Sequence, residues 1–118
     1  MNISIDELHS LEASGATIIN AGKHAGSTEI RGAIRYRPDD LLNAAHLALP
    51  IATDRPVVLY DERGTGPQLE AIADKLRANG YPDVRILAAG FADYAAAEEP
   101  TQAASTEQIV PPSKPPET

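Results

Sequence analysis

The stretch Pro56-Val57-Val58-Leu59-Tyr60-Asp61 decides the fold of this chain. Its four consecutive apolar or aromatic residues, Val57 to Tyr60, are typical of a central parallel strand that is covered on both faces. A turn at 61–67 follows. Beyond it, residues at positions i, i+3, i+4 and i+7 form one apolar helix face: Leu69, Ile72, Ala73 and Leu76. Gly80 is expected to end that helix in the left-handed conformation. The segment therefore predicts a strand, a turn and a helix.

Strand and helix signals alternate on both sides of this unit. A capping box formed by Ser4 and Glu7 predicts the start of the first helix. Further strands are predicted at 17–19, 33–36 and 84–87, and further helices from Pro38 and from Gly90. Such alternation predicts an α/β fold in three layers, with a mostly parallel sheet of about five strands between helices.

Composition and charge exclude several classes of protein. The 118 residues suffice for one domain with a real core. Because 10 Lys and Arg stand against 17 Asp and Glu, the net charge is −7, which argues against binding of nucleic acid or of an anionic membrane surface. No apolar run approaches the roughly 20 residues that a membrane helix needs. The first ten residues do not resemble a secretory leader, so we expect a cytoplasmic protein.

The chain contains no cysteine, and its composition changes near Pro100. The missing thiols exclude disulfides, thiolate metal ligands and any cysteine nucleophile. Residues 100–118 hold Pro111, Pro112, Pro115 and Pro116 and almost no large apolar side chain. Since proline fixes φ and lacks a backbone donor, we predict a domain at 1–99 and a mostly disordered tail at 100–118.

The turn after the central strand is the best candidate for a site, because open α/β sheets bind ligands at the carboxyl ends of their strands. The candidate loop consists of Asp61, Glu62, Arg63, Gly64, Thr65 and Gly66. Its glycines and the following helix N-terminus suit an anion cradle. The carboxylates of Asp61 and Glu62 oppose an anion, and only Arg63 offsets them. A tight turn with a solvated charge cluster is the competing interpretation.

Two families of enzymes share part of this pattern. The stretch from Val57 to Thr65 resembles the first motif of the haloacid dehalogenase superfamily, with Asp61, Gly64 and Thr65 in place but Arg63 where that family has its second Asp. A mid-chain strand that ends in Asp also resembles response-regulator receivers. Receivers need an acidic pair after their first strand, whereas Asn20 stands here. These likenesses keep open a hydrolase or phosphotransfer role for Asp61.

A more extensive resemblance covers about residues 3–98. The stretch from Gly80-Tyr81 through Val84 and Leu87 to Ala89-Gly90 and Tyr94 resembles the end of a rhodanese domain. Upstream, Ile30-Arg31-Gly32-Ala33 resembles the family's His-Ile-Pro-Gly-Ala motif, with Glu29 in place of the His. The resemblance implies the rhodanese fold, and the opening stretch 3–8 matches its first strand and helix.

The departures from the rhodanese pattern concern its chemistry. Active rhodaneses end the central strand in the catalytic Cys, and the resemblance places Asp61 there. The residue that is commonly Arg in the reaction loop is Gly66, and the usual Asp and Arg after the second strand fall at Asn20 and Gly22. A carboxylate cannot carry a persulfide sulfur. The resemblance therefore implies a fold of the sulfurtransferase family without its activity.

The leading hypothesis is a non-catalytic rhodanese-like module that binds a protein partner, possessing no cofactor, metal or catalytic residue. Asp61 and Glu62 would select a partner with a basic segment. The alternative is an enzyme or small-anion binder that uses Asp61. Of the other candidates, Tyr60 is expected in the core, and Arg35 and Arg37 are expected at the solvent edge of a strand. The histidines lack metal-ligand spacing: His9, His24 and His46.

Overall fold

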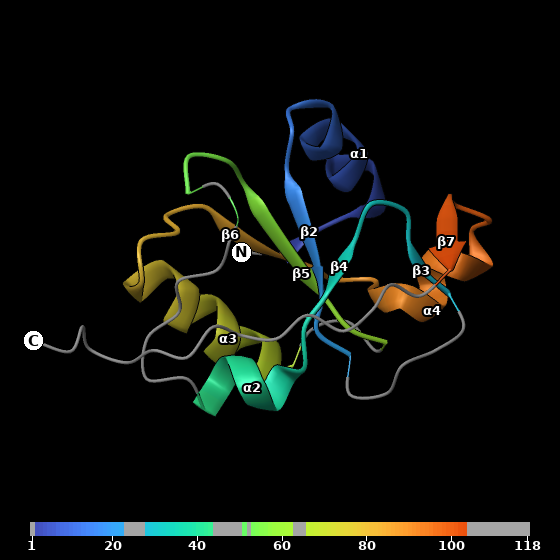
Figure 1. Cartoon of the computed structure of the whole chain (residues 1–118). Coiled ribbons are helices and arrows are strands. Elements are labelled where there is room, and N and C mark those ends of the chain that lie inside the picture. The colour runs from blue at the N-terminus through green and yellow to red at the C-terminus, as the bar shows by residue number, and fades with distance from the viewer. Residues whose placement is uncertain (1, 23–27, 44–50, 52, 63–65, 104–118) are drawn as a thin grey trace, which may run out of the picture.

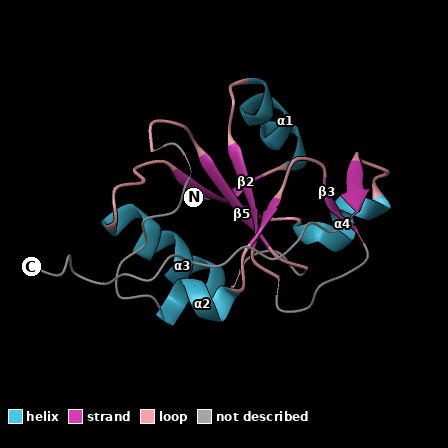
Figure 2. Cartoon of the chain, viewed as in Figure 1, coloured by secondary structure: helices cyan, strands magenta, loops and turns pink. Residues whose placement is uncertain are grey.

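The computed structural model describes residues 2–22, 28–43, 51, 53–62 and 66–103. Strands and helices alternate along most of these residues (Figures 1 and 2). The strands are β1 (Asn2–Ile3), β2 (Thr17–Asn20), β3 (Thr28–Ile30), β4 (Ile34–Arg35), β5 (Val57–Tyr60), β6 (Val84–Leu87) and β7 (Thr101–Ala103). The helices are α1 (Ile5–Ala13), α2 (Pro38–Asn43), α3 (Pro67–Ala78) and α4 (Gly90–Ala96).

A five-stranded parallel sheet forms the centre of the fold, in the order β1-β6-β5-β2-β4. The strand β5 lies in the middle, where it pairs in parallel with β2 and with β6. All four of its residues are buried, as expected for a strand covered on both faces. The predicted α/β class and the predicted five-stranded sheet are confirmed.

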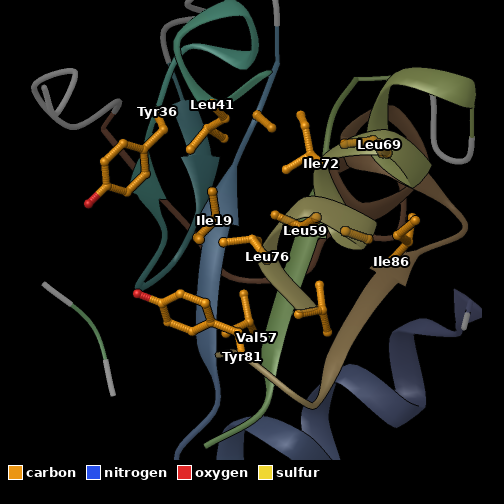
Figure 3. Close-up of a cluster of buried hydrophobic side chains, with 13 residues drawn as sticks. Ile19, Tyr36, Leu41, Val57, Leu59, Leu69, Ile72, Leu76, Tyr81 and Ile86 are labelled. Atoms are coloured by element: carbon orange, nitrogen blue, oxygen red, sulfur yellow. The ribbon is translucent and has the colours of Figure 1, made fainter. Parts of the chain in front are cut away.

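Helices cover both faces of this sheet. One core cluster contains Val57 and Leu59 of β5 together with the apolar side of α3 and Leu41 of α2 (Figure 3). The other cluster contains Val58 and Tyr60 together with residues of α1 and α4. Neighbouring residues of β5 thus serve opposite cores, because side chains of a strand alternate between its faces. Figure 1 shows α2 and α3 on one side of the sheet, with α1 on the other.

Local signals place the helices where the sequence predicts them. The hydroxyl of Ser4 accepts from the Glu7 amide, and the Glu7 carboxylate accepts from the Ser4 amide, so α1 begins with a complete capping box. The apolar positions predicted for α3 are all buried in the core. That helix ends before Gly80, whose φ of +100° lies in the left-handed region that glycine tolerates. None of the helices in the described ranges is long and apolar enough to span a membrane.

The structure differs from the sequence prediction at the start of the proposed tail. Residues Thr101–Ala103 form β7, which pairs antiparallel with β3 in a second, two-stranded sheet. A boundary at residue 99 therefore excludes a strand that belongs to the fold. The side-chain amide of Gln102 forms hydrogen bonds with polar groups of the domain. The prediction rested on the low apolar content of the segment, which does not reveal such a polar contact. Residues 104–118 lie outside the described part.

Candidate functional site

Three strands of the parallel sheet end side by side at one edge. In the register of these strands, Asn20 at the end of β2 lies between Arg35 of β4 and Tyr60 of β5. Residues that are register partners in a parallel sheet direct their side chains to the same face. This row of three polar or aromatic residues therefore lines the carboxyl edge of the sheet, directly before Asp61.

The first two residues of the candidate loop are held by helix α4. The carbonyl oxygen of Asp61 accepts from the Phe91 amide at 2.8 Å, and that of Glu62 accepts from the Ala92 amide at 3.3 Å. The first amides of a helix have no partner inside it, and the loop carbonyls satisfy two of them. As a result, the backbone at 61–62 is positioned by a rigid element, with the Asp61 side chain half-buried and the Glu62 side chain exposed.

The other end of the loop lies at the start of α3. Gly66 is extended, with φ of −174°, and Pro67 occupies the first turn of the helix. A Cβ atom built on Gly66 would meet no atom within 4 Å, so this position has room for a side chain. Arg63, Gly64 and Thr65 lie outside the described residues, and the predicted anion cradle depends on them. It stays a prediction.

A cluster of buried polar side chains lies next to the strand ends. Glu29 of β3 is 0 % exposed and Arg35 is 3 % exposed. The Glu29 carboxylate accepts from Asn20 Nδ2 at 3.3 Å and from Gln102 Nε2 at 2.7 Å. Asn20 Oδ1 in turn accepts from the Gly22 amide at 3.0 Å. Buried carboxylates need such donors, because an unsatisfied charge away from water is costly.

Sequence reasoning found only part of this cluster. It singled out Asn20 and Glu29 as departures from a family pattern, but it assigned Gln102 to a disordered tail. It also expected Arg35 at a solvent edge, and that expectation is wrong because the side chain is buried. The available signal was the pair of opposite charges at 29 and 35, of which only Arg35 lies on a segment predicted as a strand. Arg37 is exposed, as expected for a strand edge.

Tyr60 is buried in the core, which confirms the prediction for this residue. Its hydroxyl oxygen accepts a hydrogen bond of 3.1 Å from the Ile30 amide, which ties β5 to β3. Its ring lies 6.2 Å from that of Phe91 in α4. Burial raises the pKa of Tyr60 well above its ordinary value of 10.0, so the hydroxyl stays neutral at physiological pH.

The histidines form no common site in the part of the chain that the structure describes. His9 of α1 lies 2.9 Å from the Glu99 carboxylate, joining the first helix to the segment after α4. His24 and His46 lie outside the described residues. Among residues with described positions, no three His, Asp or Glu side chains are grouped so that they could hold a metal ion.

Comparison with known proteins identifies the family. The model of the rhodanese-like domain matches residues 12–97, well over half of the chain. The chain belongs to the rhodanese-like domain family. The resemblance predicted from the motifs is thereby confirmed. This rhodanese-like domain has no cysteine anywhere in its 118 residues.

Solved structures with the same fold come from distant organisms. A full-length protein from Lactobacillus plantarum superposes with a TM-score of 0.71 at 16 % identity, covering 86 % of this chain and 87 % of the other. A human single-domain sulfurtransferase gives 0.64 at 22 % identity, with 80 % and 95 % covered. A rhodanese homologue from Thermus thermophilus gives 0.59 at 25 % identity, with 76 % and 95 % covered. The sequence matches none of the curated proteins.

Proposed function

We propose that this rhodanese-like domain is a protein-interaction or regulatory module without sulfurtransferase activity. The observation that carries the proposal is the absence of cysteine from the sequence. Sulfur transfer in the family passes through a persulfide on the cysteine that ends the central strand, and the resemblance places Asp61 at that position. A carboxylate oxygen forms no persulfide, and no other residue of the chain can supply the thiol.

The charge at the loop also opposes the family's substrate. Thiosulfate is an anion, and the side chains of Asp61 and Glu62 follow the strand end directly. Two carboxylates repel an anion over distances within the Debye length, about 8 Å at physiological ionic strength. The same pair attracts a cationic group, which makes a basic segment of a partner protein the favoured ligand.

The backbone at this position suits a binding surface. Since the carbonyls of Asp61 and Glu62 are hydrogen-bonded to α4, ordering them on docking costs little conformational entropy. The exposed Glu62 side chain is available to a partner, and the half-buried Asp61 lies beside it. Charges of this kind act mainly on the association rate and on the choice of partner.

The test is capture of partners by the full chain from the native host, comparing two variants of equal net charge. Asp61→Asn with Glu62→Gln removes both charges of the loop. Glu12→Gln with Asp54→Asn removes two exposed charges near the opposite edge of the sheet, because these residues precede β2 and β5. We expect a partner that the wild type and the Glu12/Asp54 variant retain and the Asp61/Glu62 variant loses.

Association rates of the two variants with the captured partner then show whether the loop itself, or only the net charge of the protein, affects binding. We expect the Asp61/Glu62 variant to bind the captured partner more slowly, most clearly at low salt, because surface charges are screened as salt rises. Equal rates for both variants at low and at high salt would exclude the loop as the interface. Calorimetry with sulfate, phosphate and thiosulfate, with and without Mg²⁺, tests the alternative of a small-anion site. Saturable heat from any of these ions would favour that alternative.

A further inference from the structure

The strand β7 is held to the domain almost entirely by hydrogen bonds. Its first and last residues, Thr101 and Ala103, are exposed, and only the Gln102 side chain between them is half-buried. By contrast, every residue of β5 is buried. Stabilisation by apolar burial grows with the area removed from water, so β7 gains little from it. Its attachment depends on polar contacts.

Those polar contacts centre on one side-chain amide. Gln102 Oε1 accepts from the Gly32 amide at 2.9 Å. Gln102 Nε2 donates to Glu29 Oε2 at 2.7 Å and to the Ala33 carbonyl at 3.3 Å. The amide thus has partners at both its oxygen and its nitrogen, on the three residues that surround the turn after β3. A single side chain therefore contacts both sides of this turn.

Two further contacts fix the residue that precedes β7. The carbonyl oxygen of Pro100 accepts from the Tyr94 hydroxyl at 2.7 Å and from the Arg31 amide at 3.2 Å. Segment 100–103 therefore crosses from the end of α4 to the outer side of β3, as Figure 1 shows for β7, β3 and α4. We name this segment the strap.

A charged group lies under the strap. The Glu29 carboxylate, which accepts from Gln102, is 0 % exposed. Burying a charged group away from water costs solvation free energy. When the strap opens, water reaches the carboxylate and part of that free energy is regained. The free energy needed to lift the strap is thereby reduced relative to a strand that covers apolar residues.

We propose that the strap, residues 100–103, opens and closes as a unit while the five-stranded sheet stays folded. Opening exposes the buried Glu29 to water and frees one edge of β3. Proteins open locally in cooperative units whose free energies lie below that of global unfolding, and segments with few apolar contacts are the first to open.

The strap is connected to the candidate loop through strand β3. Strand β3, which the strap covers, donates from the Ile30 amide to the Tyr60 hydroxyl. Tyr60 directly precedes Asp61, so a displacement of β3 changes the support of the loop. The strap is thus a mobile element close to the proposed binding surface. Its opening does not depend on which partner the domain binds.

Native-state hydrogen exchange of the full chain tests the proposal, with two amides as reporters. The Arg31 amide donates to Pro100 of the strap, and the Ala21 amide donates to the Tyr60 carbonyl at 2.8 Å at the edge of the central sheet. In urea below the unfolding transition, we expect Arg31 exchange to depend little on urea, because a local opening exposes little surface. Ala21 exchange should depend on it steeply. If both amides follow one common dependence, the strap does not open separately.

Two neighbouring substitutions on β7 supply the matched comparison. Gln102→Ala removes the amide that holds the strap, and Thr101→Ala removes an exposed side chain from the same strand. We expect Arg31 exchange to be about 10- to 100-fold faster in Gln102→Ala and still to depend little on urea, with Thr101→Ala close to the wild type. Ala21 exchange should accelerate by no more than the same factor and should keep its steep urea dependence, because the Gln102 contacts are lost in the unfolded chain as well. No acceleration of Arg31, or an Arg31 exchange in Gln102→Ala that depends on urea as steeply as that of Ala21, would each overturn the proposal.

Discussion

Gln102 and Glu29, separated by 73 positions in the sequence, are joined by a 2.7 Å hydrogen bond from Nε2 to Oε2. The carboxylate is 0 % exposed, so this donor replaces water that burial has removed. Removing the donor would leave a buried acceptor unsatisfied, which costs more than the hydrogen bond itself contributes. A residue close to the chain's last described position therefore helps to complete the interior of the domain.

This relationship predicts how the domain responds to shortening. A chain that ends at Ala103 keeps the Gln102 contacts, whereas a chain that ends at Glu99 loses them along with all of β7. We expect the 1–99 protein to lose about 2–3 kcal/mol of unfolding free energy relative to the 1–103 protein. Urea denaturation of both proteins at equal concentration measures the difference. Identical midpoints would show that β7 contributes nothing to stability.

Alkaline pH should destabilise the protein through its buried tyrosines. Burial is the main cause that raises the pKa of Tyr94 from 10.0 to about 12, and it also raises the pKa values of Tyr60 and Tyr36. The folded protein thus holds these protons more tightly than the unfolded chain. The resulting stability is complete below pH 10 and is lost as the pH rises from about 10 to 12.

Thermal unfolding between pH 8 and pH 12 checks this prediction, with tyrosinate absorbance recorded in parallel. Tyr94→Phe is the matched variant, because it removes one titrating hydroxyl together with its bond to the Pro100 carbonyl. We expect a lower melting temperature at pH 8 and a shallower fall above pH 10 than in the wild type. A Tyr94→Phe protein with the same slope above pH 10 would exclude Tyr94 as a contributor.

The protein should show no thiosulfate:cyanide sulfurtransferase activity, because no thiol can carry the sulfur. Asp61→Cys alone should restore little, since Glu62 still repels the anion and Gly66 offers no side-chain donor. Room exists for a side chain at Gly66, so Asp61→Cys with Gly66→Arg is the informative second variant. We expect the sulfurtransferase activity of this double variant to be at least several-fold higher than that of Asp61→Cys. Turnover by the wild type above a protein-free blank would contradict the first statement.

The central strand should tolerate loss of volume poorly. Leu59 is 0 % exposed and packs in the cluster between the sheet and α3 (Figure 3). We expect Leu59→Ala to cost about 2–5 kcal/mol, the sum of lost apolar transfer and the cavity left behind. The matched substitution is Leu11→Ala in α1, where the side chain is only partly buried. It should cost clearly less, and chemical denaturation of the two variants gives the comparison.

Much of the fold could be predicted because its signals are local. The run Val57–Tyr60, the capping box at Ser4 and the apolar spacing in α3 each depend on neighbours within a few residues. Strands and helices that alternate then have few ways to pack, which leads to a parallel sheet covered on both faces. The absence of cysteine is likewise a property of the sequence alone, and it excludes persulfide chemistry whatever fold the chain adopts.

The polar interior was decided only by the tertiary structure. Whether Arg35 faces solvent or the core depends on how β4 pairs with β2 in the assembled sheet. The register that aligns Asn20 with Arg35 and Tyr60 likewise exists only there. The place of Gln102 depends on a partner 73 positions away. A short polar segment has no periodicity that predicts such a contact. The segment around Gln102 is ordered because the buried Glu29 carboxylate needs a hydrogen-bond donor. Only the folded chain brings Gln102 and Glu29 together.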